Sequence, residues 1–318
     1  DLSYIKVEPI YKYIIHKNNK ILRFFKSLLV PLKLKSVLKN ATLIKTNQLL
    51  GSWVAIISKI IYKKPLIIRT GYDLLTFSKK NKKGFIKITL YSVLTRLSLM
   101  YANIYLVSSL SDKDFLSKFS KRNSQKIKIR PNWVSKNVGN KFNNRSNNNV
   151  ISVGRLENQK NFAQLVSFFE NSEYKIDIFG EGSLQKKLIH EAEIKNVNLE
   201  IHNPIPNNDL LKLLRNYKFF ISTSSFEGNP KAILEAMAAG CVVLAMENPN
   251  VAEIIEDNFN GIIINKNKNL IKLLESLEND YEKLRYLSDN AINFINKNHL
   301  LNKIVDEEYR DYLLINNP

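Results

Sequence analysis

Short apolar runs alternate along this chain with longer segments in which apolar residues recur at helical spacing. In the first half, β-branched runs predict strands and the segments between them predict helices. The predicted strands are residues 41–46, 64–70, 103–109 and 126–134, the last ending at a turn formed by Pro131 and Asn132; the predicted helices are residues 49–62 and 85–101. We expect the Tyr and Phe side chains of residues 85–101 to lie in the core.

The same rhythm restarts, more regularly, after a polar segment at residues 142–149 that we interpret as a linker. Predicted strands are residues 149–156, 174–180, 198–203, 218–224, 241–246 and 260–265, and predicted helices are residues 161–171, 183–195, 208–216, 230–240 and 250–257. We therefore expect two α/β domains with parallel sheets, at residues 1–145 and 150–300. A last helical segment, within residues 301–318, is free to pack back on the first domain.

Ligands of doubly wound sheets bind beyond the carboxyl ends of the strands, so we examined the residues that follow each predicted strand. The stretch SSFEGNPKAILEAMAAG follows one of them. Asn229 is a suitable N-cap, Pro230 suits the first helical position, and Gly240 suits the position after the helix. The free N–H groups and dipole of such a helix start attract an anion, above all a phosphate. Glu227 and Glu235 then bracket a phosphate site, although two solvated surface glutamates are an equally simple reading of this spacing.

Arg155 and Lys160 also follow a strand and precede a helix. Two cations at this edge are suited to neutralising a diphosphate. The motifs VGRLENQKN, GEG, E-x7-E within SSFEGNPKAILEAMAAG, and NPNVAEIIEDNFNG occur in this order over residues 150–265. This pattern resembles the retaining glycosyltransferases of glycosyltransferase family 4 (glycosyl transferases group 1). The resemblance implies a GT-B fold: α/β, with two Rossmann-like doubly wound parallel-sheet domains facing a cleft.

The resemblance also implies roles for individual residues. Arg155 and Lys160 would hold the donor diphosphate and assist its departure, Glu235 would bind the ribose hydroxyls, and Glu227 would lie close to the donor sugar. The remaining donor-binding candidates are Gly154, Gly180, Gly182, Ser183, Ile205, Gly228, Asn229, Pro230 and Lys231. Such enzymes usually need no metal, so we expect neither a metal nor another cofactor beside the nucleotide-sugar.

Three features depart from the family pattern. Cys241 stands where a proline is usual, and we expect it in the core. Asn250 and Val251 stand where two glycines are common. Residues 1–18 do not supply the first strand and glycine-rich loop of the family, so we expect an N-terminal domain without its first strand.

The acceptor side is less defined. Tyr72 and Asp73 follow a predicted strand where many relatives carry a histidine, and they are acceptor-side candidates beside the simpler reading as a glycine-containing turn. Of the four histidines, we place His202 near the cleft and predict the others, His299 among them, at the surface.

Charge divides the chain unevenly. Residues 1–150 contain 30 Lys and Arg against 5 Asp and Glu, a balance of +25, whereas residues 151–318 have a balance of −6. This asymmetry indicates an anionic partner, for which we expect a membrane surface rather than nucleic acid because no aromatic strand face for RNA is evident. No apolar run is long enough to span a bilayer.

Taken together, these features predict an enzyme that transfers a sugar from a UDP- or GDP-linked donor to a glycan or lipid-linked acceptor of a bacterial envelope polysaccharide. We expect it in the cytoplasm, at the inner face of the plasma membrane. Two alternatives remain: a noncatalytic basic membrane- or nucleic-acid-binding module with a decayed GT-B fold, and a GT-B phosphorylase or synthase of storage sugars.

Overall fold

The computed structural model describes residues 19–71, 73–80, 84–135 and 145–316. The expectation about the missing first strand rests on residues 1–18, and the candidate Tyr72 stands alone between described segments; both lie outside the described residues. The chain forms two compact units. Unit 1 comprises residues 1–108, 112–130 and 308–318, and unit 2 comprises residues 109–111 and 131–307.

Unit 1 is built on a four-stranded parallel sheet in the order β1-β2-β3-β4. Its strands are β1 (Ile44–Thr46), β2 (Leu66–Arg69), β3 (Ile104–Val107) and β4 (Ile127–Ile129). All four lie inside the predicted strands. The continuous apolar runs of β2 and β3 are buried on both faces, as expected for central strands of a parallel sheet.

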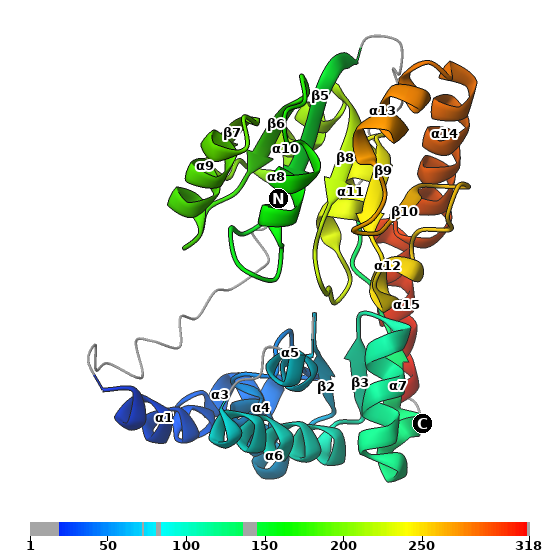
Figure 1. Ribbon diagram of the computed structural model, residues 1–318. Coiled ribbons are helices and arrows are strands. Elements are labelled where there is room, and N and C mark those ends of the chain that lie inside the picture. The colour runs from blue at the N-terminus through cyan, green and yellow to red at the C-terminus, as the bar shows by residue number, and fades with distance from the viewer. Residues whose placement is uncertain (1–18, 72, 81–83, 136–144, 317–318) are drawn as a thin grey trace. The chain divides into compact units, whose positions relative to one another are not determined.

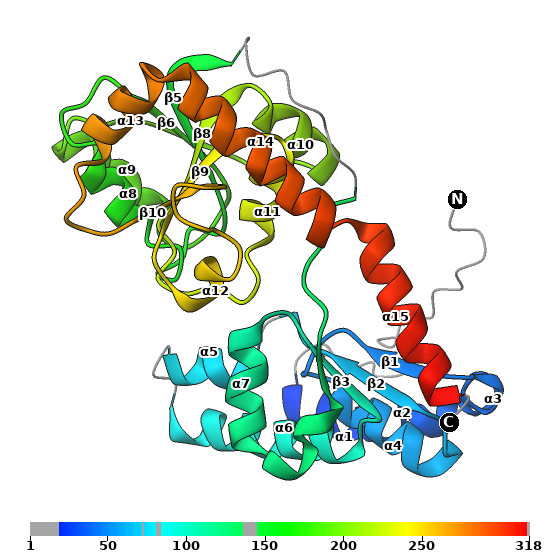
Figure 2. The same cartoon turned by 90° about the vertical axis from the view of Figure 1, so that its right-hand side faces the viewer.

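The helices of this part of the chain cover the sheet. They are α1 (Lys20–Leu28), α2 (Val30–Lys33), α3 (Lys35–Asn40), α4 (Ser52–Tyr62), α5 (Leu74–Lys80), α6 (Phe85–Tyr101), α7 (Leu110–Phe119) and the 3₁₀ helix η2 (Lys121–Lys126). Residues of α4, α6 and α7 pack with Leu66, Ile68 and Tyr105 in one core cluster. Both ribbon views place α1, α4 and α6 together on one side of this unit (Figures 1 and 2).

Helix α6 corrects one prediction. Its Leu94 and Leu99 are buried, but Phe85, which we expected in the core, is 83% exposed. The helix is apolar around most of its circumference, so spacing alone did not show which side faces the sheet.

Unit 2 carries a six-stranded parallel sheet in the order β10-β9-β8-β5-β6-β7. Its strands are β5 (Ser146–Val153), β6 (Lys175–Phe179), β7 (Asn198–His202), β8 (Tyr217–Ser222), β9 (Val242–Met246) and β10 (Ile262–Ile264). The chain starts in the middle at β5, adds β6 and β7 on one side, and then continues with β8 on the other. The order therefore reverses between β5 and β8, and such a switch point is where doubly wound folds bind ligands.

Helices cover both faces of this sheet. They are α8 (Phe162–Phe168), α9 (Gln185–Ile194), α10 (Asn207–Leu214), α11 (Lys231–Ala238), α12 (Pro249–Ala252), α13 (Leu270–Glu278) and α14 (Tyr281–Asn298). The last helix, α15 (Leu301–Asn316), follows α14 and continues into unit 1. One core cluster joins the sheet to α8, α9 and α13, and the other joins it to α10, α11 and α14. Cys241 is fully buried in the second cluster, which confirms its predicted place in the core.

The predicted linker is partly wrong. Strand β5 already begins at Ser146. The guanidinium of Arg145, which is 5% exposed, donates to the backbone oxygens of Tyr217 and Ala239 at 2.8 and 2.6 Å. A buried arginine inside an asparagine-rich stretch thus continues the sheet, because its hydrogen bonds replace the missing apolar side chains. Helix α12 is also shorter than the predicted helix at residues 250–257.

Helix α15 begins in unit 2, and from Glu308 on it belongs to unit 1. Glu308 contacts Lys45 and Arg69, and the carboxylate of Asp311 pairs with Lys128 and Arg130 at 2.7 and 2.6 Å. Ile315 packs on Ile67, Ile104 and Leu106 of the sheet. Among the described residues, no helix is both long enough and apolar enough to cross a bilayer.

Candidate functional site

Glycines allow the loops after β5 and β6 of unit 2 to touch. Gly154 N–H donates to the Phe179 oxygen at 3.0 Å, and Leu156 N–H donates to the Glu181 oxygen at 2.9 Å. A Cβ on Gly180 would stand 1.9 Å from the oxygen of Gly154, and one on Gly182 would stand 2.6 Å from the oxygen of Leu156. Only glycine permits this approach of two backbones. Ser183 joins the same contact by donating from its N–H and hydroxyl to Glu157 at 3.3 and 3.1 Å.

The loop after β5 is also bonded to the loop after β8, across the switch point. Ser225 N–H donates to the Gln159 oxygen at 2.9 Å, and the Thr223 hydroxyl donates to the Lys160 oxygen at 3.0 Å. The Gln159 amide donates to the Phe226 oxygen at 2.9 Å. Three sequence-distant loops, after β5, β6 and β8, therefore form one edge of unit 2.

Two predicted residues meet at this edge. Lys160 Nζ lies 2.6 Å from Glu227 Oε1, and the two side chains are 18% and 8% exposed. Lys160 also lies over Gly154, where an added Cβ would stand 2.9 Å from its Cε. The structure thus pairs the cation expected on the diphosphate with the acid expected near the sugar.

Arg155 differs from Lys160. Its side chain is exposed, and within the described residues its guanidinium makes no ion pair or hydrogen bond. It therefore presents a positive charge to solvent from the same loop that carries Lys160.

Helix α11 follows directly, and its start corrects the predicted cap. Pro230, not Asn229, is the N-cap residue, and in the described chain no side chain accepts from the N–H groups of the first turn. Such N–H groups carry the positive end of the helix dipole. The predicted end is confirmed, since Gly240 has φ of 78° just after the helix.

Asn229 instead anchors the loop before α11. Asn132 N–H donates to Asn229 Oδ1 at 2.8 Å, and the Asn132 side-chain amide donates to the Asn229 backbone oxygen at 2.6 Å. The amide of Asn250 donates to the Gly228 oxygen at 2.5 Å. The loop that carries Glu227 and Gly228 is therefore fixed by two asparagines from other parts of unit 2.

Asn132 is itself held by His299. The His299 Nδ1 lies 3.0 Å from the Asn132 oxygen, and the ring is 5% exposed. The prediction that His299 lies at the surface is wrong. Burial lowers the pKa of His299, so the ring is neutral at physiological pH and Nδ1–H donates to Asn132. His190, on α9, is exposed, as predicted.

Glu235 lies on the first turns of α11 and is only 4% exposed. Its Oε1 accepts from the Asn207 amide at 2.5 Å and lies 3.6 Å from Lys231 Nζ. Burial raises the pKa of Glu235, and the contacts with Asn207 and Lys231 only partly oppose this. The solvated-surface reading of Glu235 is thereby excluded. Sequence reasoning missed Asn207, although it lies two residues after the donor-binding candidate Ile205.

The remaining donor-side candidates lie in the same unit. Ile205 is half-buried against the core cluster that contains α10 and α11. The Lys231 ammonium lies 5.1 Å from the centre of the Trp133 ring. Gly228 and Pro230 are buried in the loop between β8 and α11.

Asp73, in unit 1, has a structural role. It is fully buried, and its Oδ1 accepts from the Thr76 N–H and hydroxyl at 2.6 and 2.8 Å, which caps the start of α5. Burial raises the pKa of this carboxyl. Its contact with an acceptor stays a prediction.

One group of metal-ligating side chain types occurs in the described part of unit 2. Asp177, Glu200 and His202 have ligand atoms within 4.8 Å of one another. Lys175 lies among them, 3.1 Å from Asp177 and 2.6 Å from Glu200. Burial would raise the pKa of Asp177, but hydrogen bonds from His202, Tyr217 and Lys175 outweigh it and lower that pKa. The Lys175 ammonium therefore balances the negative charge of these two acids, as a bound metal ion would.

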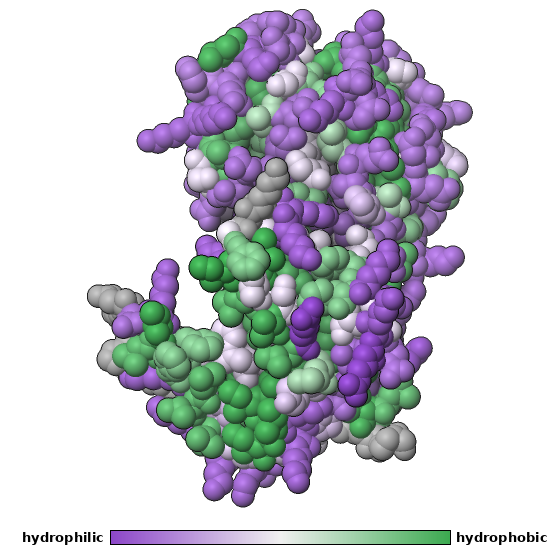
Figure 3. All heavy atoms as spheres, turned by 60° about the horizontal axis from the view of Figure 1, so that its bottom comes forward, coloured by the Kyte–Doolittle hydropathy of each residue, from purple (hydrophilic) through white to green (hydrophobic). Residues whose placement is uncertain are grey.

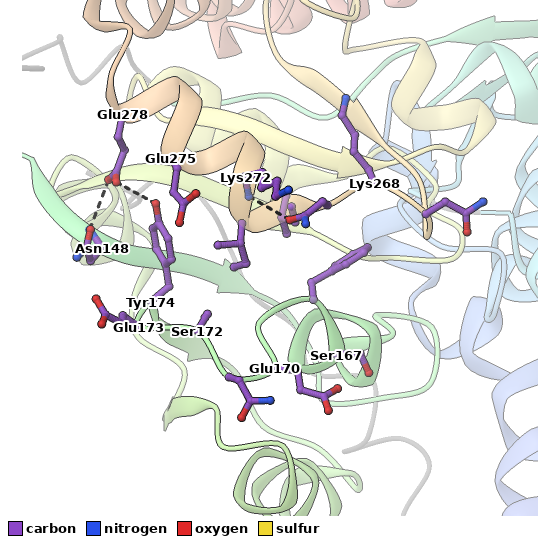
Figure 4. A pocket seen from close by; sticks show the side chains of 16 residues that line it. Asn148, Ser167, Glu170, Ser172, Glu173, Tyr174, Lys268, Lys272, Glu275 and Glu278 are labelled. Carbon is purple, nitrogen blue, oxygen red and sulfur yellow. Dashed lines mark hydrogen bonds between the residues drawn. The ribbon is translucent and has the colours of Figure 1, made fainter.

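A hollow of about 690 Å³ lies elsewhere on unit 2, between α8, α13 and the starts of β5 and β6. Figure 4 shows Glu278 accepting there from Tyr174 and from the backbone of Asn148. This is the amino edge of the sheet, whereas doubly wound domains bind at the carboxyl edge. We therefore do not assign the nucleotide to this hollow.

The comparison with known families identifies the family of this chain. The model of the family "Glycosyl transferases group 1" matches residues 136–294, half of the chain. The chain belongs to this family. The matched region contains β5 to α13, most of α14 and every donor-binding candidate predicted from the sequence.

Individual family members extend this result. The chain is 24% identical, over 74% of its length and 65% of the relative's, to "GalNAc-alpha-(1->4)-GalNAc-alpha-(1->3)-diNAcBac-PP-undecaprenol alpha-1,4-N-acetyl-D-galactosaminyltransferase" of Campylobacter jejuni. It is 30% identical, over 46% of its length and 31% of the relative's, to "Poly(ribitol-phosphate) alpha-N-acetylglucosaminyltransferase" of Staphylococcus aureus. The chain thus spans less than two thirds of the length of either relative.

A solved structure shows the same fold. The Alr3699/HepE protein of Anabaena, crystallised with UDP and glucose, superposes with a TM-score of 0.76 at 16% identity, covering 89% of this chain and 80% of that one. The two parallel α/β sheets described above thus form a GT-B fold, which confirms the predicted fold class.

Proposed function

We propose that this chain is a retaining glycosyltransferase that moves a sugar from a nucleotide-sugar to a glycan on a lipid or polymer carrier of the bacterial envelope. The observation that carries the proposal is the edge of unit 2 at the switch point. There an uncapped helix start, the Lys160–Glu227 pair, exposed Arg155 and buried Glu235 occur together. This set matches a ligand with hydroxyl groups at both ends and phosphates between.

In this proposal the diphosphate lies at the start of α11, facing Arg155 and Lys160. Glu235 accepts hydrogen bonds from the ribose hydroxyls, and Ile205 with its neighbouring loop borders the base. Lys160 exchanges its partner: it leaves Glu227 for the phosphate, and Glu227 then accepts from a hydroxyl of the donor sugar. Charge-assisted hydrogen bonds of this kind stabilise the negative charge of the departing diphosphate.

We infer UDP as the donor nucleotide, because the Anabaena neighbour was crystallised with UDP and glucose. The oxygen of the acceptor hydroxyl bonds to the anomeric carbon from the face that the nucleotide leaves, as the bond from that carbon to the diphosphate breaks. The hydroxyl proton passes to the departing diphosphate, and no metal takes part. The acceptor is a lipid-linked or polymer-linked glycan, as the names of the Campylobacter and Staphylococcus relatives state for those proteins. The basic first half then holds the enzyme at the inner face of the plasma membrane.

A transfer assay tests the proposal. The chain is incubated with UDP-linked or GDP-linked hexoses and N-acetylhexosamines and with a short polyprenyl diphosphate-linked oligosaccharide, in the presence of EDTA. We expect release of UDP and an extended glycan with the anomeric configuration of the donor, read by NMR. Glu227→Gln should abolish transfer, whereas exposed Glu256→Gln should not. Inversion of configuration, or dependence on a divalent cation, would contradict the corresponding part of the proposal.

A further inference from the structure

Helix α6 exposes an apolar stripe along its whole length. Ile86, Leu90, Val93, Leu97 and Met100 are 83%, 60%, 49%, 38% and 51% exposed. Their spacing of four, three, four and three residues places them on one face of the helix. The buried side of the same helix includes the hydroxyl residues Thr95 and Ser98. That side also includes the buried Leu94 and Leu99, so α6 is apolar on both sides, whereas a surface helix normally exposes polar side chains. The outer face of α6 is therefore suited to burial against an apolar environment.

Neighbouring helices extend this face. In α1 and the segment that follows it, Ile21, Phe25, Leu29 and Leu32 are 71%, 59%, 53% and 56% exposed. Helix α4 contacts both α1 and α6, and its Ile60 is 53% exposed. Figure 3 shows apolar side chains gathered over this end of unit 1.

The charge around the face has one sign. Residues 20–71 contain eleven Lys and Arg and no Asp or Glu, and the only charged residues of α6 are Lys87 and Arg96. A second copy of this face would bring like charges together, which disfavours self-association. Within residues 20–71 and α6, every charged residue is a cation, and apolar side chains in such surroundings are complementary to a bilayer with anionic headgroups.

We propose that the outer faces of α1, α2, α4 and α6 form a surface that inserts into the interfacial region of an anionic bilayer. The apolar side chains enter the boundary between headgroups and acyl chains, and the lysines and arginines pair with lipid phosphates. The inference rests on the proposed function for its setting, because a lipid-linked acceptor places the enzyme at such a surface. It goes beyond attraction by charge, since it requires burial of named side chains.

Vesicle flotation tests the insertion. The full chain, its double variant Ile86→Ser/Leu90→Ser and the control Ile194→Ser are mixed with vesicles of phosphatidylcholine alone or with phosphatidylglycerol. Ile194 is 71% exposed on α9 of unit 2, which makes it a matched control for Ile86. We expect binding of the parent to anionic vesicles, a loss of about tenfold in partitioning for the double variant, and none for the control.

A second readout separates insertion from adhesion by charge. In Phe85→Trp, the added indole should shift its fluorescence to shorter wavelength on anionic vesicles. Equal partitioning of the parent and the double variant, or no wavelength shift, would overturn the proposal. The proposal would also be overturned if the parent were a dimer in solution and the double variant a monomer. The apolar face would then be buried against a second copy of the chain. Titration of nucleotide without vesicles reports on the donor site separately, so failure of one proposal is distinguishable from failure of the other.

Discussion

Lys160 and Glu227 lie 2.6 Å apart and largely away from water, so each depends on the other. Lys160→Ala leaves a buried carboxylate without its partner, and we expect a loss of about 3 kcal/mol in the free energy of unfolding. Exposed Arg155→Ala should change that free energy by less than about 0.5 kcal/mol. Urea denaturation of both variants measures the difference. Equal stability of the two would show that the pair does not persist in solution.

Glu235 predicts a pH dependence of stability. Because burial raises its pKa, the folded state holds this proton more tightly than the unfolded state does. The stabilising contribution is therefore present below the unfolded pKa and is lost as pH rises through the folded pKa. Glu235→Gln removes the ionisation, so at neutral pH we expect a higher melting temperature than in the parent.

The melting temperatures of the parent and Glu235→Gln must also be compared at acidic pH. There the side chain at position 235 is neutral in both proteins, so the difference in melting temperature should shrink. Thermal unfolding at several pH values, with exposed Glu256→Gln as control, measures this. A melting temperature of Glu235→Gln that stays below the parent's at neutral pH would contradict the buried, costly carboxylate. The same variant should bind nucleotide more weakly, since a stabilising change at a binding residue commonly costs function.

At the scale of elements, the loop between β8 and α11 depends on Asn132. Its side-chain amide holds the Asn229 oxygen at 2.6 Å, while its own backbone N–H holds Asn229 Oδ1. Asn132→Ala removes only the first bond. We expect the ordered conformation of this loop to lose about 1 kcal/mol of stability. The dissociation constant for nucleotide should therefore rise about fivefold.

The control is Asn123→Ala, which removes a side-chain hydrogen bond to Ser120 in unit 1. It should lower stability by a similar amount and leave nucleotide affinity unchanged. If both variants weaken nucleotide binding equally, or neither does, Asn132 has no special part in positioning the loop.

The sequence predicted well the features that depend on neighbouring residues. Gly180 and Gly182 stood out as glycines after a predicted strand, and the structure shows that a Cβ at either would meet a backbone oxygen of the neighbouring loop. Their contact with the donor stays a prediction. The strands of both sheets followed from β-branched runs. Contacts between distant segments were not accessible in this way. Three hydrogen bonds of this kind join residues far apart in the sequence: those of Asn207 with Glu235, of Asn250 with Gly228, and of His299 with Asn132.

The errors have physical causes of the same kind. Arg145 lies in a stretch of asparagines that reads as a linker, yet its buried hydrogen bonds extend the sheet. Phe85 lies on a helix that is apolar on both sides, so its exposure depends on which side the sheet occupies. Asparagine is a common N-cap residue, but Asn229 Oδ1 accepts from the Asn132 N–H instead of from the start of α11.

At the scale of the whole molecule, the end of α15 is held on unit 1 by ion pairs. Asp311 is 1% exposed and pairs with Lys128 and Arg130. Asp311→Asn leaves two cations facing a neutral amide, so we expect a loss of about 3 kcal/mol and faster cleavage by trypsin after Arg310. Asp306→Asn, at an exposed position of the same helix, should change neither property. Unchanged cleavage in Asp311→Asn would mean that the ion pairs of Glu308 and the apolar contacts of Ile315 hold the helix without Asp311.

Calorimetric titration of UDP, GDP and ADP is the most direct test that the switch-point edge of unit 2 is a nucleotide-sugar site. The proteins to compare are the parent, Arg155→Ala, Glu235→Gln and the control Arg285→Ala, whose arginine is exposed on α14. We predict that UDP binds the parent and Arg285→Ala equally, and at least about tenfold more weakly in the other two variants. UDP binding that survives both substitutions, or no binding of any nucleotide to the parent, would contradict the assignment and favour a basic module without a donor site.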